Sequence, residues 1–308
     1  MDALLALCDE PCELEPMEDR VVLEELGEDE GLVTAFAYTG LGTYRTWGRW
    51  PRLVDESGVK LREKKGRSRP RPQLWRHVRA LQGEGKFEDA MTPLLDTEYV
   101  VFGERNCFRK LGGLENAKWD VGVFWDSTLE AALLWKIDTK GFATGATGAG
   151  AVFEARRTTA GALHEYMMVC KRRVGTMTFL ISGETDAFDL DWPGEEAIDR
   201  RAVLDAAAEL YSGTRKKLKP WKFVQCQLLG IPRIVTNDND NVRPFEQLQD
   251  VSKLANTVAA AVTAARSTPD CWLIVQRRNG VITYAVAGEQ GHRLGEAAVP
   301  CWPSQLFD

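Results

Sequence analysis

Two acidic residues stand at the end of a predicted strand, spaced so that their carboxylates share one face. Glu184 and Asp186 follow the apolar residues 176–182 within the segment Ser182-Gly183-Glu184-Thr185-Asp186. On a strand, residues two positions apart point to the same side. Neighbouring carboxylates repel each other unless a cation lies between them, and Mg²⁺ and Mn²⁺ prefer such oxygen ligands. The pair therefore indicates either a metal site or a solvated strand end.

A third carboxylate, Glu165, lies in a segment that we expect to be helical, residues 163–168. A helical glutamate directed at the end of the strand would complete a metal site with Glu184 and Asp186. The alternative is an exposed surface charge. Because the seven cysteines contain no Cys-x-x-Cys pair, we do not expect a zinc site.

Residues 216–229 are basic and amphipathic, which predicts a helix that ends at Gly230 before a buried strand at 231–235. Its lysines, Lys217 among them, are suited to contact the phosphates of a nucleic acid. Gln225 lies about two turns into this helix. The alternative is a docked helix whose lysines simply face the solvent.

Hydrophobic patterning predicts a mixture of strands and helices along the rest of the chain. The turn residues Asn279-Gly280 predict a hairpin of residues 271–275 and 281–286. Residues 195–210 and 254–265 have helix-favouring compositions. Further strands are expected at 31–50, 99–102, 119–125, 133–137 and 176–182, and a loop at 141–150.

Charge is distributed unevenly along the chain. The 308 residues carry 39 basic and 45 acidic side chains, and residues 1–30 contain twelve of the acidic ones but a single basic one. We therefore expect an acidic, mobile tail at 1–30 and a mildly basic domain at 31–308, with a basic loop near 60–79. The tail could instead be a partner-binding or autoinhibitory arm over a basic groove.

The composition is that of an ordinary globular chain, with 44% hydrophobic and 27% charged residues. No run approaches the ~18 apolar residues of a membrane helix, so we expect no membrane association. The first residues lack the pattern of a secretory leader. We therefore expect an intracellular protein, nuclear or cytoplasmic, with reduced cysteines.

Four segments resemble, in chain order, motifs of the DXO family of RNA 5′-end decapping and quality-control nucleases. Residues 216–235 are similar to its signature Lys-Leu-Leu-Lys-Trp-Trp-Ala-Gln-Ser-Phe-Leu-x-Gly-Val-Pro-x-Ile-Val, which places Gln225 on the family's site glutamine. Residues 99–111 resemble a strand followed by Arg-Gly-Leu-x-Thr-Lys-Leu, which places Arg105 on a substrate-contacting arginine. Residues 161–165 resemble the family's Gly-x-x-x-Glu motif, and residues 183–186 its Gly-Glu-Val-Asp motif.

This resemblance, which covers most of residues 95–302, implies a single α/β domain. In it, two mixed β-sheets flanked by helices form a cleft related to that of PD-(D/E)XK nucleases. It also implies metal ligation by Glu165, Glu184 and Asp186 with Mg²⁺ or Mn²⁺, and RNA contacts from Arg105, Gln225 and Lys217. In such enzymes, divalent metals activate water for hydrolysis at an RNA 5′ end.

One family motif has no evident counterpart in this chain. The family carries a strand with Glu-hydrophobic-Lys, and the best counterpart here, residues 202–210, has Val203-Leu204-Asp205 in its place. In the family, the glutamate is a metal ligand and the lysine orients the attacking water and stabilises charge on the phosphate. This alignment predicts an incomplete site, unless Glu195, Glu196 or Glu209 replaces the lost ligand.

Two functions follow from the resemblance. The favoured one is a catalytically impaired protein that binds RNA 5′ ends, or acts as a scaffold for a protein partner such as a 5′-3′ exoribonuclease. The alternative is an active, metal-dependent 5′-end decapping hydrolase and exoribonuclease, which requires a replacement for the missing lysine. A globular α/β protein with no nucleic-acid role is a third possibility.

Overall fold

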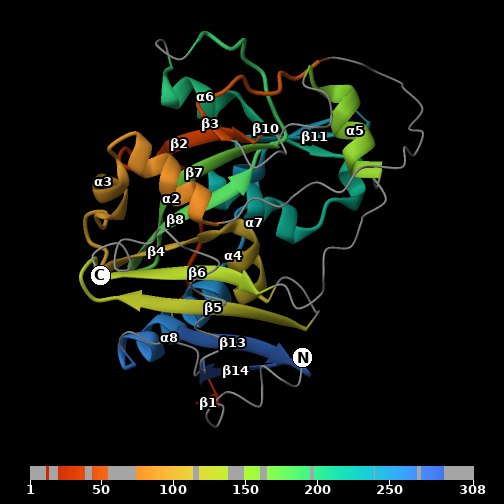
Figure 1. The fold of residues 1–308 in the computed structure, drawn as a ribbon. Helices are drawn as coiled ribbons and strands as arrows, with labels where there is room; N and C mark the ends of the chain where they lie inside the picture. The colour runs from red at the N-terminus through yellow and green to blue at the C-terminus, as the bar shows by residue number, and fades with distance from the viewer. Residues whose placement is uncertain are drawn as a thin grey trace.

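The computed structural model describes residues 12–13, 20–38, 44–54, 74–113, 118–137, 149–159, 165–194, 198–238, 240–268 and 272–287 (Figure 1). These residues form two mixed sheets with helices packed around them. The large sheet has ten strands, in the order β1 (Cys12–Glu13), β14 (Val281–Val286), β13 (Trp272–Arg278), β5 (Trp119–Asp126), β6 (Ala131–Ile137), β4 (Tyr99–Glu104), β8 (Met177–Glu184), β7 (Glu165–Val174), β2 (Gly31–Tyr38) and β3 (Tyr44–Thr46). The small sheet has four, in the order β12 (Asn241–Val242), β11 (Arg233–Thr236), β10 (Ala207–Tyr211) and β9 (Ala187–Phe188).

Strand direction makes both sheets mixed. Strand β4 runs parallel to its neighbours β6 and β8, and β10 runs parallel to β11. The other pairings between these strands are antiparallel, including the predicted hairpin of β13 and β14. Its turn residues Asn279 and Gly280 have φ angles of 53° and 88°, which an Asn-Gly pair adopts at little cost.

Helices lie on both faces of the large sheet, and α5 (Ala149–Arg157) packs beside the small one. They are α2 (Leu74–Gly83), α3 (Phe87–Met91), α4 (Arg105–Leu111), α5 (Ala149–Arg157), α6 (Arg200–Ala206), α7 (Pro220–Leu229) and α8 (Ser252–Arg266), with short 3₁₀ turns η2 (Arg215–Lys217) and η3 (Pro244–Glu246). Alternate residues of the central strands face opposite cores. Val101 and Ile181 share a core with residues of α4, α7 and α8, whereas Val100 and Leu180 pack with residues of α2 and α3.

The predicted helix at 163–168 is wrong, because the chain from Glu165 onward is strand β7. This strand pairs with β8 on one side and β2 on the other. Tyr166 and Met168 belong to one core, while Val169 belongs to the core on the opposite face. In a strand with both faces buried, apolar residues follow one another without alternation. The local sequence does not distinguish such a run from a buried helix.

The predicted helix at 195–210 covers two different elements. Helix α6 ends at Ala206, and residues 207–211 continue as strand β10 between β9 and β11. Asp199 caps α6 by accepting from the backbone N–H groups of Arg201 and Ala202. Alanine favours a helix in isolation, but pairing with two strands and burial of residues 207–210 override that preference.

The basic helix starts later than its composition predicts. Residues 215–217 form the turn η2, and α7 begins at Pro220, which occupies the first helical position where its missing N–H costs nothing. At the other end Gly230 closes the helix with a φ of 70°, as the sequence predicts. The predicted strand at 231–235 is observed as β11.

Part of the predicted acidic tail packs against the rest of the structure. Leu23 is 1% exposed and lies in the main core, and the backbone of Val21 hydrogen-bonds to Val251 and to the Ser252 hydroxyl. Most of residues 1–19, and residues 55–73 of the predicted basic loop, lie outside the described residues. The last part of that loop is helix α2, in which Arg76 is buried. No helix in the described ranges combines the length and apolarity needed to cross a bilayer.

His77 makes stability depend on pH. Its ring is fully buried edge-on against Phe36, and neither ring nitrogen has a hydrogen-bond partner among the described residues. Burial, with a smaller contribution from the Arg76 charge, lowers the pKa of His77 to about 3. The unfolded chain then binds the extra proton from about pH 6.5 downward, so stability should fall by up to about 1.4 kcal/mol per pH unit between those two pKa values.

The measurement is urea unfolding at pH 7 and pH 5 for the wild type and for His77→Phe. Because the variant lacks this titration but keeps the other acid-sensitive groups, its stability should fall less between the two pH values. Parallel losses in the two proteins would show that His77 is not the group responsible.

Candidate metal and phosphate site

Three carboxylates converge where the chain leaves the large sheet and enters the small one. Glu184 is the last residue of β8, Asp186 lies two residues later just before β9, and Glu154 comes from α5. One oxygen of each carboxylate lies within 4.8 Å of the other two, and all three side chains are half-buried. We call Glu154, Glu184 and Asp186 the carboxylate cluster. The predicted pair is therefore brought together with a third acid that the sequence analysis missed.

Glu154 is an additional carboxylate at the site, and the expectation that Glu165 is a metal ligand stays a prediction. Glu165 begins strand β7, and its side chain lies outside the described part of the structure. The segment Gly150-Ala-Val-Phe-Glu154 has the same Gly-x-x-x-Glu spacing as residues 161–165. That spacing was the signal available for Glu154. Residues 141–150 were predicted to be a loop, but helix α5 already begins at Ala149.

The segment Val203-Leu204-Asp205 does not occupy the site, so the alignment that placed it there is wrong. Val203 and Leu204 are core residues of helix α6, and Asp205 forms an exposed ion pair with Arg201. Glu209 is one of the residues that the sequence left open as a replacement for the motif glutamate. It lies on a strand, in the middle of β10. The residue two positions after Glu209 is Tyr211, so strand β10 carries Glu-Leu-Tyr and no Glu-hydrophobic-Lys.

Glu209 is enclosed by basic and amide side chains from two helices. Its Oε1 accepts hydrogen bonds from the Lys222 ammonium and from Gln225 Nε2 at 3.2 Å. Its Oε2 accepts from Arg105 Nη1 at 3.3 Å, and the side chain is only 2% exposed. Arg105 also donates to the backbone carbonyl of Glu184 at 2.9 Å, which connects Glu209 to the carboxylate cluster.

The charges around Glu209 decide its ionisation. Burial raises the pKa of Glu209, but Lys222 and Arg105 outweigh that effect and hold the pKa below its usual value. Burial lowers the pKa of Lys222, and the Glu209 and Asp186 carboxylates reverse this, so the net shift is upward. Glu209 and Lys222 therefore form a charged pair at neutral pH.

Asp186 has the opposite environment. Burial raises its pKa well above the usual value, and the charges of Glu209, Glu154 and Glu184 raise it further. One of its oxygens, Oδ2, accepts a hydrogen bond from the backbone N–H of Leu210 at 2.7 Å. This bond joins the loop after β8 to strand β10. A divalent cation would relieve the repulsion that disfavours the ionised form of Asp186.

The two remaining predicted residues lie on the basic segment. Gln225 is 6% exposed on α7, and its Oε1 is buried with no hydrogen-bond partner among the described residues. Lys217 is exposed on η2, and its backbone carbonyl accepts a hydrogen bond from the Tyr211 hydroxyl at 2.9 Å. Tyr211 thus anchors the basic turn to the strand that carries Glu209.

The carboxylate cluster fits a hard divalent cation. Three oxygens at this separation match the preference of Mg²⁺ and Mn²⁺ for carboxylate ligands with water at the remaining positions. Burial and the neighbouring carboxylates both raise the pKa of Asp186, and a bound cation would offset that repulsion. Glu154, Glu184 and Asp186 would hold such a cation.

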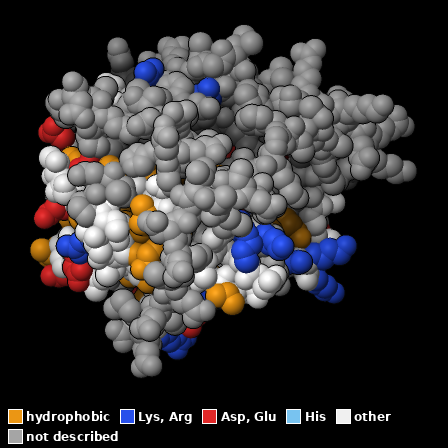
Figure 2. Space-filling model, turned by 60° about the horizontal axis from the view of Figure 1, so that its bottom comes forward, with side chains coloured by type: hydrophobic (Ala, Val, Ile, Leu, Met, Phe, Trp, Pro, Cys, Tyr) orange, Lys and Arg blue, Asp and Glu red, His pale blue; other side chains and the backbone are white. Residues whose placement is uncertain are grey.

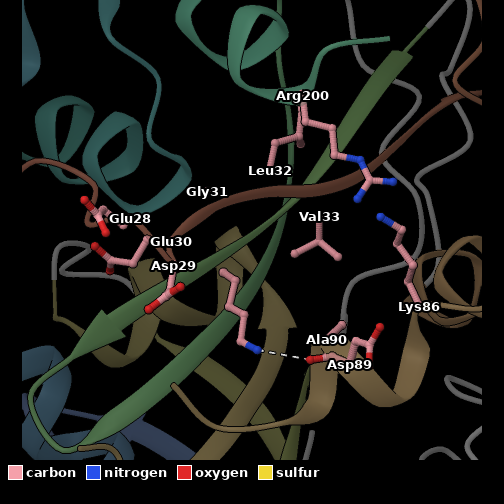
Figure 3. A pocket seen from close by; sticks show the side chains of 11 residues that line it. Glu28, Asp29, Glu30, Gly31, Leu32, Val33, Lys86, Asp89, Ala90 and Arg200 are labelled. Carbon is pink, nitrogen blue, oxygen red and sulfur yellow. Dashed lines mark hydrogen bonds between the residues drawn. The ribbon is translucent and has the colours of Figure 1, made fainter. Parts of the chain in front are cut away.

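A pocket of about 230 Å³ lies elsewhere, between residues 28–33, α3 and the start of α6 (Figure 3). Its charged groups hold neighbouring segments together. Arg200 pairs with Glu84, the Lys171 ammonium donates to the Asp89 carbonyl at 3.1 Å, and Glu30 accepts from the Arg173 backbone N–H. The carboxylate cluster does not line this pocket. We therefore interpret the pocket as the space that remains where residues 27–33 pack against neighbouring elements.

Comparison with known proteins identifies the architecture. No family model matches the chain, and no curated protein sequence matches it. Several solved structures match the chain. Rai1 of Candida albicans in complex with pU5 and Mn²⁺ superposes with a TM-score of 0.66 at 12% identity, over 97% of this chain and 98% of that one. The chain has the Rai1/Dxo1 fold.

Two further structures support this assignment. Rai1 of Scheffersomyces stipitis, solved with (3′-NADP)⁺ and a calcium ion, matches with a TM-score of 0.62 at 14% identity, over 91% of this chain and 96% of that one. Dxo1 of K. lactis in complex with manganese matches with a TM-score of 0.58 at 13% identity, over the same shares. The resemblance to the DXO family is thereby confirmed at the level of the fold, as are the two mixed sheets flanked by helices.

Proposed function

We propose that this chain is a divalent-metal-dependent hydrolase that acts on RNA 5′ ends. The observation that carries the proposal is the carboxylate cluster, in which Glu154, Glu184 and Asp186 bring three oxygens within 4.8 Å of one another. The expectation of an impaired protein rested on the loss of both the motif glutamate and the motif lysine. Glu209 and Lys222 supply a buried carboxylate and a buried ammonium next to the cluster, although on different elements from those of the motif. The solved relatives bound to pU5 and Mn²⁺, and to (3′-NADP)⁺ and calcium, support the same choice of ligands.

Positive charge near the cluster suits a phosphate. Arg105 is held by Glu209 and by the Glu184 carbonyl, which leaves other N–H groups of its guanidinium for a phosphate oxygen. The segment that leads into α7 adds exposed cations, namely Arg215, Lys216, Lys217 and Lys219. Figure 2 shows that most lysine and arginine side chains in view lie toward the lower right, whereas most carboxylates lie at the left edge. Exposed cations such as those before α7 favour approach of a polyanion.

In the reaction, the oxygen of a water molecule forms a bond to phosphorus while the bond from phosphorus to the leaving oxygen breaks. The leaving oxygen takes up a proton. A divalent cation, when bound, lowers the pKa of water and neutralises phosphate oxygens. Arg105 orients the phosphate and offsets its growing negative charge. The unpartnered Oε1 of Gln225 can accept a hydrogen bond from the attacking water or from a substrate hydroxyl.

Binding without turnover is the second candidate, and Tyr211 favours it. A tyrosine in place of the family's lysine gives strand β10 no cation at this position. The partner expected in that case, a 5′-3′ exoribonuclease, and the nuclear or cytoplasmic location stay predictions.

The test is hydrolysis of RNAs with 5′ triphosphate, unmethylated cap, NAD or monophosphate ends, each with Mg²⁺ and with Mn²⁺. The comparison protein is the double variant Glu184→Gln/Asp186→Asn, which keeps side-chain size. Turnover that the double variant loses would support the hydrolase. If no RNA is cut but 5′-end binding persists and weakens with salt, the protein is a binder, and the proposal of hydrolysis is wrong.

A further inference from the structure

Lys222 is an unusual residue for its position in helix α7. It is the third residue of the helix, in the turn where the helix dipole already places positive charge. Its side chain is nevertheless only 13% exposed, with the ammonium hydrogen-bonded to Glu209 Oε1 and lying 5.2 Å from the centre of the Trp221 ring. A buried cation is stabilised by neighbouring carboxylates. The acidic site therefore explains why a lysine occupies this position, whereas the helix dipole would disfavour it.

Glu209 has no oxygen free of positive or amide donors. Lys222 and Gln225 donate to Oε1, and Arg105 donates to Oε2. Among the described residues, the acids whose oxygens approach one another as metal ligands do are Glu154, Glu184 and Asp186, without Glu209. The four acids therefore divide into three that face each other and one that two cations neutralise.

Lys222 also stands at a different place from the lysine of the family motif. In the quoted family signature, the position three residues before the glutamine is tryptophan, and here it is Lys222. On strand β10 the corresponding motif position is Tyr211, whose hydroxyl donates to the carbonyl of Lys217. The ammonium in this site is thus supplied by α7 and bound directly to the carboxylate of Glu209.

We propose that Lys222 is a fixed cation that withholds Glu209 from metal binding, so that the site takes a single divalent cation. The inference rests on the proposed function, because it assumes that the carboxylate cluster binds metal. Its physical reason is electrostatic: Lys222 and Arg105 already neutralise the Glu209 carboxylate, and the buried ammonium repels a second cation. Lys222 is a positioning residue here, since it acts through Glu209.

The experiment is calorimetric titration of the metal-free full chain with Mn²⁺, without RNA. The wild type should bind one Mn²⁺. Lys222→Met removes the charge and keeps an unbranched side chain, and it should bind a second Mn²⁺ or bind the first about tenfold more tightly. Lys222→Arg keeps the charge and should behave like the wild type. Lys253→Met removes an exposed lysine from α8, away from the site, and should also leave Mn²⁺ binding unchanged.

Changes at Glu209 make the test independent of how well Lys222→Met folds. Because Glu209 is not a ligand in the wild type, Glu209→Gln should bind Mn²⁺ within about twofold of the wild-type affinity. The double variant Lys222→Met/Glu209→Gln should return to one Mn²⁺. Loss of Mn²⁺ binding in Glu209→Gln would overturn the proposal, as would identical Mn²⁺ binding by Lys222→Met and the wild type.

The proposed function and this inference can fail separately. If the wild type binds one Mn²⁺ and the variants behave as expected while no RNA is cut, hydrolysis is excluded and the role of Lys222 is supported. If RNA is cut but Lys222→Met binds Mn²⁺ as the wild type does, the inference fails and the hydrolase remains. Absence of Mn²⁺ binding in the wild type and in all variants overturns both.

Discussion

Replacing Glu154 by glutamine should reduce metal-dependent RNA hydrolysis by at least about 100-fold. Residues that only orient a metal ligand typically cost 10- to 100-fold in metal affinity or activity when mutated, and a direct ligand should cost at least as much. Glu154 provides one of the three oxygens that lie within 4.8 Å of one another. Glutamine keeps the size and one carbonyl oxygen but removes the charge that attracts a divalent cation.

The measurement is the hydrolysis rate over a series of Mn²⁺ concentrations, together with Mn²⁺ affinity in the absence of RNA. Glu88→Gln is the matched control, because it removes the same charge from an exposed position on α3. Glu165→Gln completes the comparison, since the sequence motif had pointed to Glu165. A large loss in Glu165→Gln with a normal Glu154→Gln would mean that the ligand comes from the start of β7.

Replacing Arg172 by leucine should destabilise the protein by about 3–5 kcal/mol, the usual cost of removing one partner of a buried ion pair. Arg172 is 1% exposed in the middle of β7. Its guanidinium donates to the carbonyls of Gln227 and Glu24 and lies 3.6 Å from the Glu30 carboxylate. One side chain thus joins β7 to α7 and to residues 24–30. Leucine would leave two carbonyls without their donor and the Glu30 carboxylate without its opposite charge.

Urea unfolding measures this effect. Arg201→Leu is the control, because Arg201 belongs to an exposed i,i+4 pair with Asp205, with side chains 63% and 61% exposed. Its loss should change the free energy of unfolding by no more than about 0.5 kcal/mol. Equal effects of the two substitutions would show that the contacts of Arg172 are not coupled to global unfolding.

Much of the large sheet follows from the sequence. Strands β4, β5 and β8 and the hairpin of β13 and β14 coincide with runs whose apolar residues or turn residues are sufficient by themselves. Helix α8 follows from its alanine-rich composition, and Gly230 marks the end of α7. These elements are decided by interactions between residues near in sequence, which is why a single sequence reveals them.

The metal ligands could be predicted only in part. Glu184 and Asp186 follow a strongly predicted strand at a spacing of two, so their proximity is a local property. Glu154 joins them from α5, about thirty residues earlier, and was not among the candidates that the sequence suggested. Its proximity depends on the packing of α5 beside the small sheet, where core residue Phe153 contacts a cluster that includes Ala208 and Leu210.

The part of the site around Glu209 was decided by tertiary structure. Residues 207–210 have a helix-favouring composition, but between β9 and β11 their backbone hydrogen bonds are made with other strands. This pairing brings Glu209 beside the N-terminal turn of α7, where Lys222 neutralises it. The sequence by itself determined which residue types were available for chemistry. The pairing of distant strands determined which carboxylates face each other and which one is neutralised, because a buried charge is stabilised by neighbours that local sequence does not specify.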